Sequence, residues 1–269
     1  MKITTDKHKI IKLLRKEKKL GFVPTMGALH KGHISLIKKS ISQCNKTVVT
    51  IFINKPQFNS SSDFKKYPRK LNNDISQIKK LKVDFLYLPK ENEIYPNGPN
   101  KKIKIHPFGK KLCGKFRPNH FKAVVDIIDR FIKILNPKNI YFGNKDLQQL
   151  KLVDNFVSKK YPSTKIISCK TIRDKNGLAL SSRNFLLSVK EKALASKVFN
   201  ILNKNKTLLL NKKISINFIK KKIFNLGIKK IDYLEVLDIN KIFIKNKKKS
   251  LKKIFIAYYL SNVRLIDNI

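Results

Sequence analysis

Short runs rich in β-branched and aromatic residues alternate along the chain with longer segments in which apolar residues recur at helical spacing. The runs with strand character lie at residues 20–25, 47–53, 83–88, 139–143 and 165–169. Between them, apolar residues form one helical stripe within 34–44 and another within 71–81, and the broadest apolar helix face spans 119–135. Strands that alternate with helices in this way predict a parallel sheet covered by helices.

The pattern changes after about residue 171. Two amphipathic helical stretches are followed there by strand-like runs at 230–237, 254–260 and 263–267. We therefore expect two domains: residues 1–175 with the parallel sheet, and residues 176–269 as a smaller α+β domain. Right-handed crossovers make the first domain a doubly wound α/β sheet, which binds ligands outside the carboxyl ends of its strands.

Composition excludes some classes of protein and raises one alternative. A chain of 269 residues with 42% hydrophobic content has enough apolar side chains for a core, so wholesale disorder is excluded. A formal net charge of +44 is typical of proteins that bind nucleic acid or anionic membranes. However, the surplus is nearly all lysine, 54 against 7 arginines, and it is spread from residue 2 to residue 253. Nucleic-acid binding therefore stays the alternative function, and we expect no specific nucleic-acid partner.

The cysteines and the apolar runs indicate a compartment. Cys44, Cys113 and Cys169 are far apart and form no C-x-x-C pair, so neither a disulfide framework nor a zinc ribbon is expected. No apolar run reaches the roughly 18 residues of a membrane span, and the first twenty residues have no apolar signal segment. We expect free thiols, no membrane association and a cytoplasmic location.

The first predicted strand leads directly into a glycine-bearing turn and the start of a helix. The residues of this segment are Met26, Gly27, Ala28, Leu29, His30, Lys31, Gly32 and His33. A helix N-terminus after such a turn offers unpaired N–H groups and a positive dipole end to phosphate oxygens, and two imidazoles add donors. Alternatively, the two histidines only cap the helix or lie on its surface. No Cys or carboxylate stands near them at ligand spacing, so we assign no metal ligand.

A second polar cluster follows the predicted strand at 139–143, and its residues are Gly143, Asn144, Lys145, Asp146, Gln148 and Gln149. Lys145 can neutralise phosphate, and Asp146 can accept hydrogen bonds from ribose hydroxyls. Taken alone, a Lys-Asp pair at a helix start is more often a helix cap with a solvated neighbour. Gln57 follows another strand, and like Gln149 it is a neutral amide suited to hold the hydroxyl and carboxylate oxygens of a small substrate. Single glutamines are also common on surfaces.

A third cluster spans residues 173–184, at the expected domain boundary. Its hydroxyl-rich part is Leu180, Ser181, Ser182 and Arg183, which can wrap phosphates with side-chain and backbone donors. The alternative is an ordinary linker with a turn at Asn176-Gly177. Most of the few arginines fall in or beside polar clusters, where a planar fork is useful: Arg69, Arg117, Arg173, Arg183 and Arg264.

Together these segments resemble the pantothenate synthetases, the ATP-dependent pantoate:beta-alanine ligases of the HxGH nucleotidyltransferase superfamily, over nearly the whole chain. The residues that carry the resemblance are 23–30, Gly32-His33, Gln57-Phe58, Tyr95-Pro96, Arg117, His120-Phe121, Phe142-Gly143, Lys145-Asp146, Gln148-Gln149, 177–184 and 264–268. Each motif is weak alone, but their shared order and spacing are highly specific.

The resemblance implies a Rossmann-like first domain, a smaller C-terminal domain that acts as a lid, and a homodimer. It implies an ATP site formed by Met26 to His33, Gly143 to Asp146, Ile172 and Leu180 to Arg183. His33 would be the acid that assists departure of pyrophosphate, and His30 and Lys145 would stabilise charge beside it. Gln57 would contact pantoate and beta-alanine, and Gln149 would contact pantoate.

The implied reaction has two steps. Pantoate attacks the α-phosphate of Mg-ATP to give pantoyl adenylate and pyrophosphate, and the amine of beta-alanine then displaces AMP. ATP with Mg²⁺, pantoate and beta-alanine are therefore the expected small molecules. A closer alternative is another HxGH adenylyltransferase, for example one that acts on a nucleotide or on phosphopantetheine.

Several positions depart from the pattern of that family. Asn54-Lys55-Pro56 stands where the family has Asn-Pro-x, Asn144 replaces a common Glu, and Cys113 replaces the Glu of a Leu-Glu-Gly motif. Common Gly, Gly and Thr are replaced by Asn119, Ala123 and Asp126. Because carboxylates are lost, we expect weaker positioning of the metal or of lysine, which would affect catalytic efficiency and not the identity of the reaction.

Overall fold

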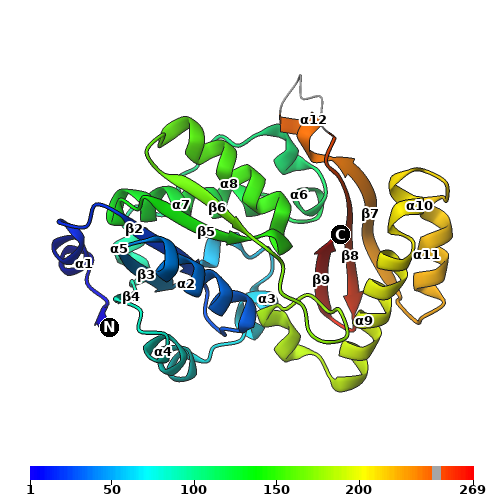
Figure 1. Ribbon diagram of the computed structural model, residues 1–269, viewed down its shortest axis with the longest axis horizontal. Helices are drawn as coiled ribbons and strands as arrows, with labels where there is room; N and C mark the ends of the chain where they lie inside the picture. The colour runs from blue at the N-terminus through cyan, green and yellow to red at the C-terminus, as the bar shows by residue number, and fades with distance from the viewer. Residues whose placement is uncertain (244–249) are drawn as a thin grey trace. The chain divides into compact units, whose positions relative to one another are not determined.

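The computed structural model describes residues 1–243 and 250–269, and these form two compact units, Met1–Lys170 and Thr171–Ile269 (Figure 1). The sequence placed the boundary near residue 175, and the chain passes from one unit to the other between Lys170 and Thr171.

In the described part of the chain, unit 1 contains a six-stranded sheet in the order β1-β4-β3-β2-β5-β6. The strands are β1 (Lys2–Thr4), β2 (Leu20–Thr25), β3 (Lys46–Ile51), β4 (Phe85–Tyr87), β5 (Asn139–Gly143) and β6 (Lys165–Cys169), and each neighbouring pair is parallel. The chain proceeds outward from β2 to β4 and then returns to build β5 and β6 on the other side. The strand order therefore reverses between β2 and β5, as in a doubly wound fold.

Helices cover both faces of this sheet. Phe22 points into a core with α1 (Lys7–Leu14) and α7 (His120–Leu135), and its neighbour Val23 points into the opposite core with α2 (Lys31–Gln43) and α4 (Leu71–Lys80). Successive residues of a strand face opposite sides of the sheet, so a strand covered on both sides is apolar throughout. The α/β doubly wound fold expected from the sequence is confirmed.

Short helices lie in the connections of unit 1, together with the long α8. They are η1 (Lys55–Gln57), α3 (Ser61–Lys66), α5 (Glu91–Ile94), η2 (Pro107–Lys110), α6 (Cys113–Phe116), η3 (Asn144–Asp146) and α8 (Leu147–Lys160). The helix expected at 119–135 is α7, whose residues are mostly buried because it crosses the centre of the sheet. Asn119 caps it with φ +62°, a backbone conformation that Gly, Asn and Asp tolerate best.

Unit 2 is an α+β unit with, in its described residues, a three-stranded antiparallel sheet in the order β7-β8-β9. Its elements are η4 (Ser182–Leu186), α9 (Val189–Lys204), α10 (Lys206–Leu210), α11 (Ile216–Phe224), β7 (Lys230–Asp238), α12 (Ile239–Phe243), β8 (Lys252–Leu260) and β9 (Val263–Asn268). Ile219 and Ile223 of α11 and Val198 of α9 belong to one hydrophobic core with Ile256 of the central strand. The smaller α+β unit was expected from the sequence.

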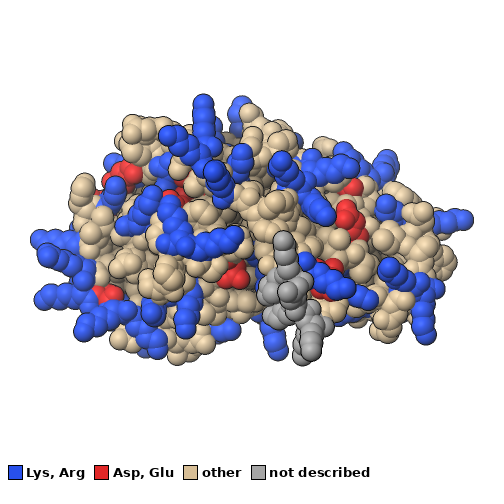
Figure 2. Space-filling view, turned by 90° about the horizontal axis from the view of Figure 1, so that it is seen from above, with Lys and Arg blue, Asp and Glu red and all other residues tan. Residues whose placement is uncertain are grey.

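Nowhere in residues 1–243 and 250–269 does a helix have the length and apolar character needed to cross a membrane. Lysine and arginine side chains are scattered among uncharged residues over the face in Figure 2, and acidic side chains are few.

Candidate active site at the carboxyl ends of the parallel strands

The first two polar clusters meet at the point where the strand order reverses. β2 and β5 are neighbours in the sheet, the segment 26–30 leaves the carboxyl end of β2, and Asn144–Asp146 leaves that of β5. Ligands of doubly wound sheets bind in the crevice between such diverging connections. The topology thus brings together two segments that lie more than a hundred residues apart in the sequence.

The turn after β2 is held by a buried carboxylate. Asp74 of α4 is 1% exposed and accepts from the main-chain N–H of Ala28 at 2.8 Å and of Leu29 at 2.7 Å. Gly27 and Ala28 have φ of +80° and +49°, which is unfavourable for alanine, so the turn needs this fixed support. Burial raises the pKa of Asp74, although the two N–H bonds oppose the shift. Sequence analysis did not identify Asp74, a carboxylate on the apolar stripe of its helix.

The two histidines of the turn cap α2 and lie against each other. Nδ1 of His30 accepts from the N–H of Gly32 at 3.1 Å, Nδ1 of His33 accepts from the N–H of His30 at 3.4 Å, and the ring centroids are 4.1 Å apart. Because each Nδ1 is an acceptor, a neutral ring carries its proton on Nε2. A Cβ on Gly32 would lie 2.7 Å from Cε1 of His30, so a larger residue there would displace the capping ring of His30. The capping role raised as an alternative is present, and it leaves both Nε2–H donors available.

Lys145 acts electrostatically on both imidazoles. Burial, followed by the positive charge of Lys145, lowers the pKa of His30 to about 4, against a smaller opposing effect of Asp146. Burial, His30 and Lys145 together hold the pKa of His33 well below its usual range. Both rings are therefore neutral near pH 7, and they act as hydrogen-bond donors rather than as cations.

The residues after β5 leave space beside these donors. A Cβ on Gly143 would have no heavy atom within 4 Å, so packing inside the protein does not explain this glycine. Lys145 is 17% exposed in its side chain and contacts Asp146 at 3.3 Å, whose carboxylate is 46% exposed. Asn144, which stands in place of a common Glu, accepts from the hydroxyl of Ser168 through Oδ1 at 2.6 Å.

Gln57 lies beside the turn after β2. Its Nε2 approaches Sδ of Met26 at 3.1 Å, and its Oε1 accepts from Nδ2 of Asn54 at 2.9 Å. The main-chain oxygen of Gln57 accepts from Nδ1 of His120 at 2.8 Å and from Arg117 at 3.2 Å. A residue expected to bind substrate thus touches a residue expected to bind ATP.

The adjacent glutamines of α8 have different environments. Gln148 is 5% exposed, donates from Nε2 to the carbonyls of Phe108 and Lys111, and accepts from the N–H of Cys113, so it secures the loop 108–113. Gln149 is half-buried, and its amide makes no hydrogen bond with any residue that the structure describes. Of these two adjacent glutamines, Gln149 is the one whose amide is not used by the described residues and can bind a ligand. Cys113 is buried in the loop that Gln148 secures.

The third polar cluster belongs to unit 2. Ile172 accepts through its carbonyl from the N–H of Leu180 at 2.9 Å, and Ser181 caps η4 by accepting from the N–H of Arg183 at 3.3 Å. Ser182 is buried. These residues form one ordered segment of that unit.

Arg173 has a structural partner instead of a free fork. It binds Asp267 through both guanidinium nitrogens at 2.6 and 2.8 Å and stacks on Phe199 at 4.2 Å. Arg264 similarly binds Asp232 at 2.7 Å. At both positions the guanidinium group makes an ion pair inside unit 2 and so stabilises the fold.

Across residues 1–243 and 250–269, no group of three or more His, Cys, Asp or Glu side chains could hold a metal ion. The site is instead a set of N–H, imidazole, ammonium and amide donors around the ends of β2 and β5. Such donors suit anionic oxygens.

A doubly wound sheet with a glycine turn, paired imidazoles and a lysine at its switch point defines an α/β protein with a candidate site for an anionic ligand. The family model described as pantoate-beta-alanine ligase matches residues 2–269, and the chain belongs to this family. The family expected from the motifs is therefore confirmed.

Curated relatives and solved structures agree with this assignment. The chain is 38% identical to pantothenate synthetase of Sulfurihydrogenibium sp. (strain YO3AOP1) over 265 residues, which cover 97% of this chain and 95% of that protein. Pantothenate synthetase of Flavobacterium psychrophilum is 39% identical over 262 residues, covering 95% and 93%. A crystal structure of pantoate-beta-alanine ligase from Francisella tularensis, complexed with beta-gamma ATP and beta-alanine, is 36% identical with a TM-score of 0.88, covering 100% of this chain and 97% of that one.

Proposed function

We propose that this protein condenses pantoate with beta-alanine to give pantothenate, with ATP converted to AMP and pyrophosphate through a pantoyl adenylate. The observation that carries the proposal is the convergence of His30, His33 and Lys145 at the switch point of a chain that matches the ligase family from residue 2 to residue 269.

The chemistry follows from what a carboxylate lacks. Its oxygen is a poor leaving group, so pantoate cannot acylate an amine directly. Transfer of AMP to that oxygen creates a good leaving group, and the amine then attacks the activated carbonyl. The protein needs mainly to position three small molecules and to stabilise charge on the phosphates.

In the first step, the Nε2–H groups of His30 and His33 and the ammonium of Lys145 would stabilise charge that develops on the phosphates. A neutral imidazole can donate a hydrogen bond without transferring its proton. The negative charge of bound phosphates would raise the pKa of His33 and favour the acid role implied by the family resemblance. Asp74 would support this site indirectly, because its carboxylate accepts from the N–H groups of Ala28 and Leu29 and so fixes the turn that carries His30 and His33.

In the second step, Gln57 and Gln149 would orient pantoate, and Gln57 would also contact beta-alanine. By resemblance, Ile172 and Leu180 to Arg183 would bind ATP and shield the adenylate from water. Asn144 and Asp146 would lie beside the ribose, where Asp146 offers an exposed carboxylate.

Mg²⁺ would enter as the complex with ATP, because Mg²⁺ takes its ligands largely from phosphate oxygens and water. The donor set of the described site suits those phosphates, and no side chain is assigned to the ion.

The deciding experiment incubates the protein with ATP, Mg²⁺, pantoate and beta-alanine, and omits one component at a time. We expect AMP and the amide product only in the complete mixture, and pyrophosphate exchange into ATP only with pantoate present. ATP consumption that does not depend on pantoate would reject the proposal, and activity with a nucleotide or phosphopantetheine substrate would favour another adenylyltransferase.

A homodimer and a cytoplasmic location stay predictions from the sequence. Analytical ultracentrifugation tests the homodimer, because the molar mass that it measures for a dimer would be about twice the chain mass of 31.2 kDa.

A further inference from the structure

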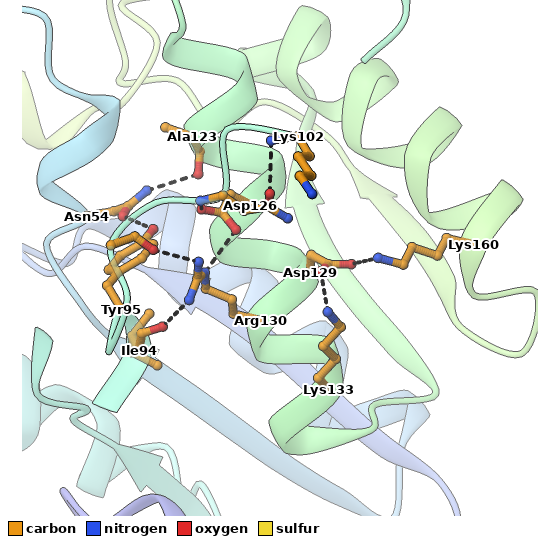
Figure 3. A network of polar contacts seen from close by, with 12 residues as sticks. Asn54, Ile94, Tyr95, Lys102, Ala123, Asp126, Asp129, Arg130, Lys133 and Lys160 are labelled. Atoms are coloured by element: carbon orange, nitrogen blue, oxygen red, sulfur yellow. Dashed lines mark hydrogen bonds and ion pairs between the residues drawn. The ribbon is translucent and has the colours of Figure 1, made fainter. Parts of the chain in front are cut away.

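Two side chains in the core of unit 1, Asn54 and Tyr95, form a chain of hydrogen bonds that ends on Gln57. The hydroxyl of Tyr95 donates to Oδ1 of Asn54 at 2.6 Å (Figure 3). Nδ2 of Asn54 donates to Oε1 of Gln57 at 2.9 Å. Asn54 is 1% exposed and Tyr95 is 8% exposed, so water does not compete for these bonds. We call Tyr95, Asn54 and Gln57 the amide relay.

The direction of the amide relay is fixed at one point. Nδ2 of Asn54 also lies 3.3 Å from the main-chain carbonyl of Ala123, which can only accept. The NH₂ group of Asn54 must therefore face α7, and its oxygen must face Tyr95. The second hydrogen on Nδ2 is then directed at Gln57, whose oxygen receives it. Because Oε1 is occupied in this way, Nε2 of Gln57 is the atom left facing the site.

The outer end of Gln57 has hydrogen-bonding capacity to spare. Its Nε2 has two hydrogens, and its neighbour in the described residues is the thioether of Met26 at 3.1 Å, a weak acceptor. The main chain of Gln57 is held separately by His120 and Arg117. The glutamine therefore has a fixed backbone and a side-chain donor directed outward, a geometry suited to a carboxylate or hydroxyl oxygen.

Tyr95 is itself held on its far side. The guanidinium of Arg130 stacks on its ring at 4.4 Å from the centroid, and Arg130 binds Asp126 at 2.9 Å and the carbonyl of Ile94 (Figure 3). Arg130 also donates to the carbonyl of Gly98. Burial, followed by the charge of Asp126, raises the pKa of Tyr95, so its hydroxyl stays protonated and remains a donor. Asp126 is one of the departures from the family pattern, and here it supports the relay.

We propose that Tyr95 is a positioning residue for pantoate, which acts through Asn54 to present the Nε2–H donor of Gln57, rather than its carbonyl oxygen, to an oxygen atom of pantoate. This inference rests on the proposed function. Tyr95 does not touch substrate in this scheme. Because it acts through Gln57, loss of its hydroxyl should weaken the use of pantoate and leave the binding of ATP unchanged.

The test compares Tyr95→Phe with Tyr87→Phe, a matched control. Tyr87 is also fully buried in unit 1, but its hydroxyl has no hydrogen-bond partner in the described structure. We expect Tyr95→Phe to lower kcat/KM for pantoate by about tenfold, as for one lost hydrogen bond that orients a donor. The KM for ATP should change less than twofold, and Tyr87→Phe should leave both constants unchanged.

A double-mutant cycle tests whether Tyr95 acts through Gln57. With Gln57→Ala already present, Tyr95→Phe should cause no further loss in kcat/KM for pantoate, because the group that it orients is gone. An equal loss in both backgrounds, an equal change in the KM for ATP, or an effect no larger than that of Tyr87→Phe overturns the inference while the proposed function stands. Wild-type protein that makes no pantoate-dependent product overturns both.

Discussion

The two histidines of the β2–α2 turn are neutral donors because burial and Lys145 oppose a positive charge on either ring. Each Nδ1 is used inside the turn, so each Nε2–H is available to a phosphate oxygen. Preorganised donors of this kind stabilise charge without rearranging during the reaction. Under the proposed function, the same two residues would cap the helix and stabilise charge on the phosphates.

We expect His33→Ala to lower the pantoate-dependent ATP/pyrophosphate exchange rate by at least about a hundredfold, because one preorganised donor to the phosphates is lost. His8→Ala is the control, since His8 is exposed on α1. Exchange by His33→Ala at the wild-type rate would remove His33 from the catalytic residues.

The lowered pKa of His30 also predicts how stability depends on pH. Between about pH 6.5 and 4 the unfolded chain binds a proton at this residue and the folded chain does not, so stability falls as the pH decreases through this range. His30→Asn removes the titration and keeps a side-chain oxygen that can cap Gly32. Urea unfolding at pH 7 and pH 5 should show a greater loss for the wild type, by roughly 1 kcal/mol. Equal losses would contradict the assigned pKa.

At the scale of elements, helix α4 fixes the turn between β2 and α2, which we propose binds the nucleotide. Asp74 of α4 accepts from the N–H groups of Ala28 and Leu29, which lie 46 and 45 positions before it in the sequence. Its two oxygens hold the turn in a conformation that alanine would otherwise avoid. The anion site of β2 therefore depends on the packing of α4.

Asp74→Asn should raise the KM for ATP by about tenfold and lower the free energy of unfolding by about 1–3 kcal/mol, because an amide NH₂ would face one of the two N–H donors. Asp154→Asn is the control: burial raises the pKa of that carboxyl too, but it makes no hydrogen bond with the described residues. A normal KM for ATP in Asp74→Asn would show that the turn does not need this carboxylate. Thermal unfolding measures the stability of both variants.

The elements were easier to predict than the contacts between them. The bounds of β2, β5 and β6 agree with the sequence prediction because each is a continuous run between clear breaks. β3 ends at Ile51, before the predicted 53, since the chain turns into η1 there, and β4 is shorter than predicted. β1 was missed because three residues at a sheet edge carry too little periodicity.

In the site, too, the sequence predicted the positions of segments better than the contacts of single side chains. The order of motifs placed residues 26–33 and 143–146 at strand ends, and the parallel topology places them side by side. The separate environments of Gln148 and Gln149 could not be read from the sequence, because adjacent residues of a helix point about 100° apart and only packing decides which is buried. Asp74 and Asn54 act through partners distant in sequence, for which local patterns give no signal.

At the scale of the whole molecule, the excess of positive charge dominates. With 61 cationic against 17 acidic residues, most lysines can have no carboxylate partner. Lysines with such partners include Lys46, Lys133 and Lys160. Figure 2 shows the cations dispersed over the face in view, so their repulsion is distributed and not confined to one site.

This repulsion should make stability depend on ionic strength. We expect the melting temperature to rise by a few degrees when NaCl is increased from 10 to 150 mM, as the screening length falls from roughly 30 to 8 Å. KCl at the same ionic strength should give the same rise, because screening does not depend on the identity of the ion. A melting temperature that is unchanged over this range would contradict the prediction.

The same charge should cause nonspecific binding of polyanions, and we expect no sequence-specific binding of nucleic acid. Each phosphate contact releases counterions, so affinity for duplex DNA should fall steeply between 50 and 200 mM salt, by about a thousandfold or more if six or more contacts form. Two unrelated duplexes of equal length should bind equally, because dispersed lysines contact phosphates and read no base edges. Fluorescence anisotropy titrations measure both properties. Sequence-selective binding that persists above physiological salt would instead favour the nucleic-acid function, since only base contacts can supply affinity that salt does not remove.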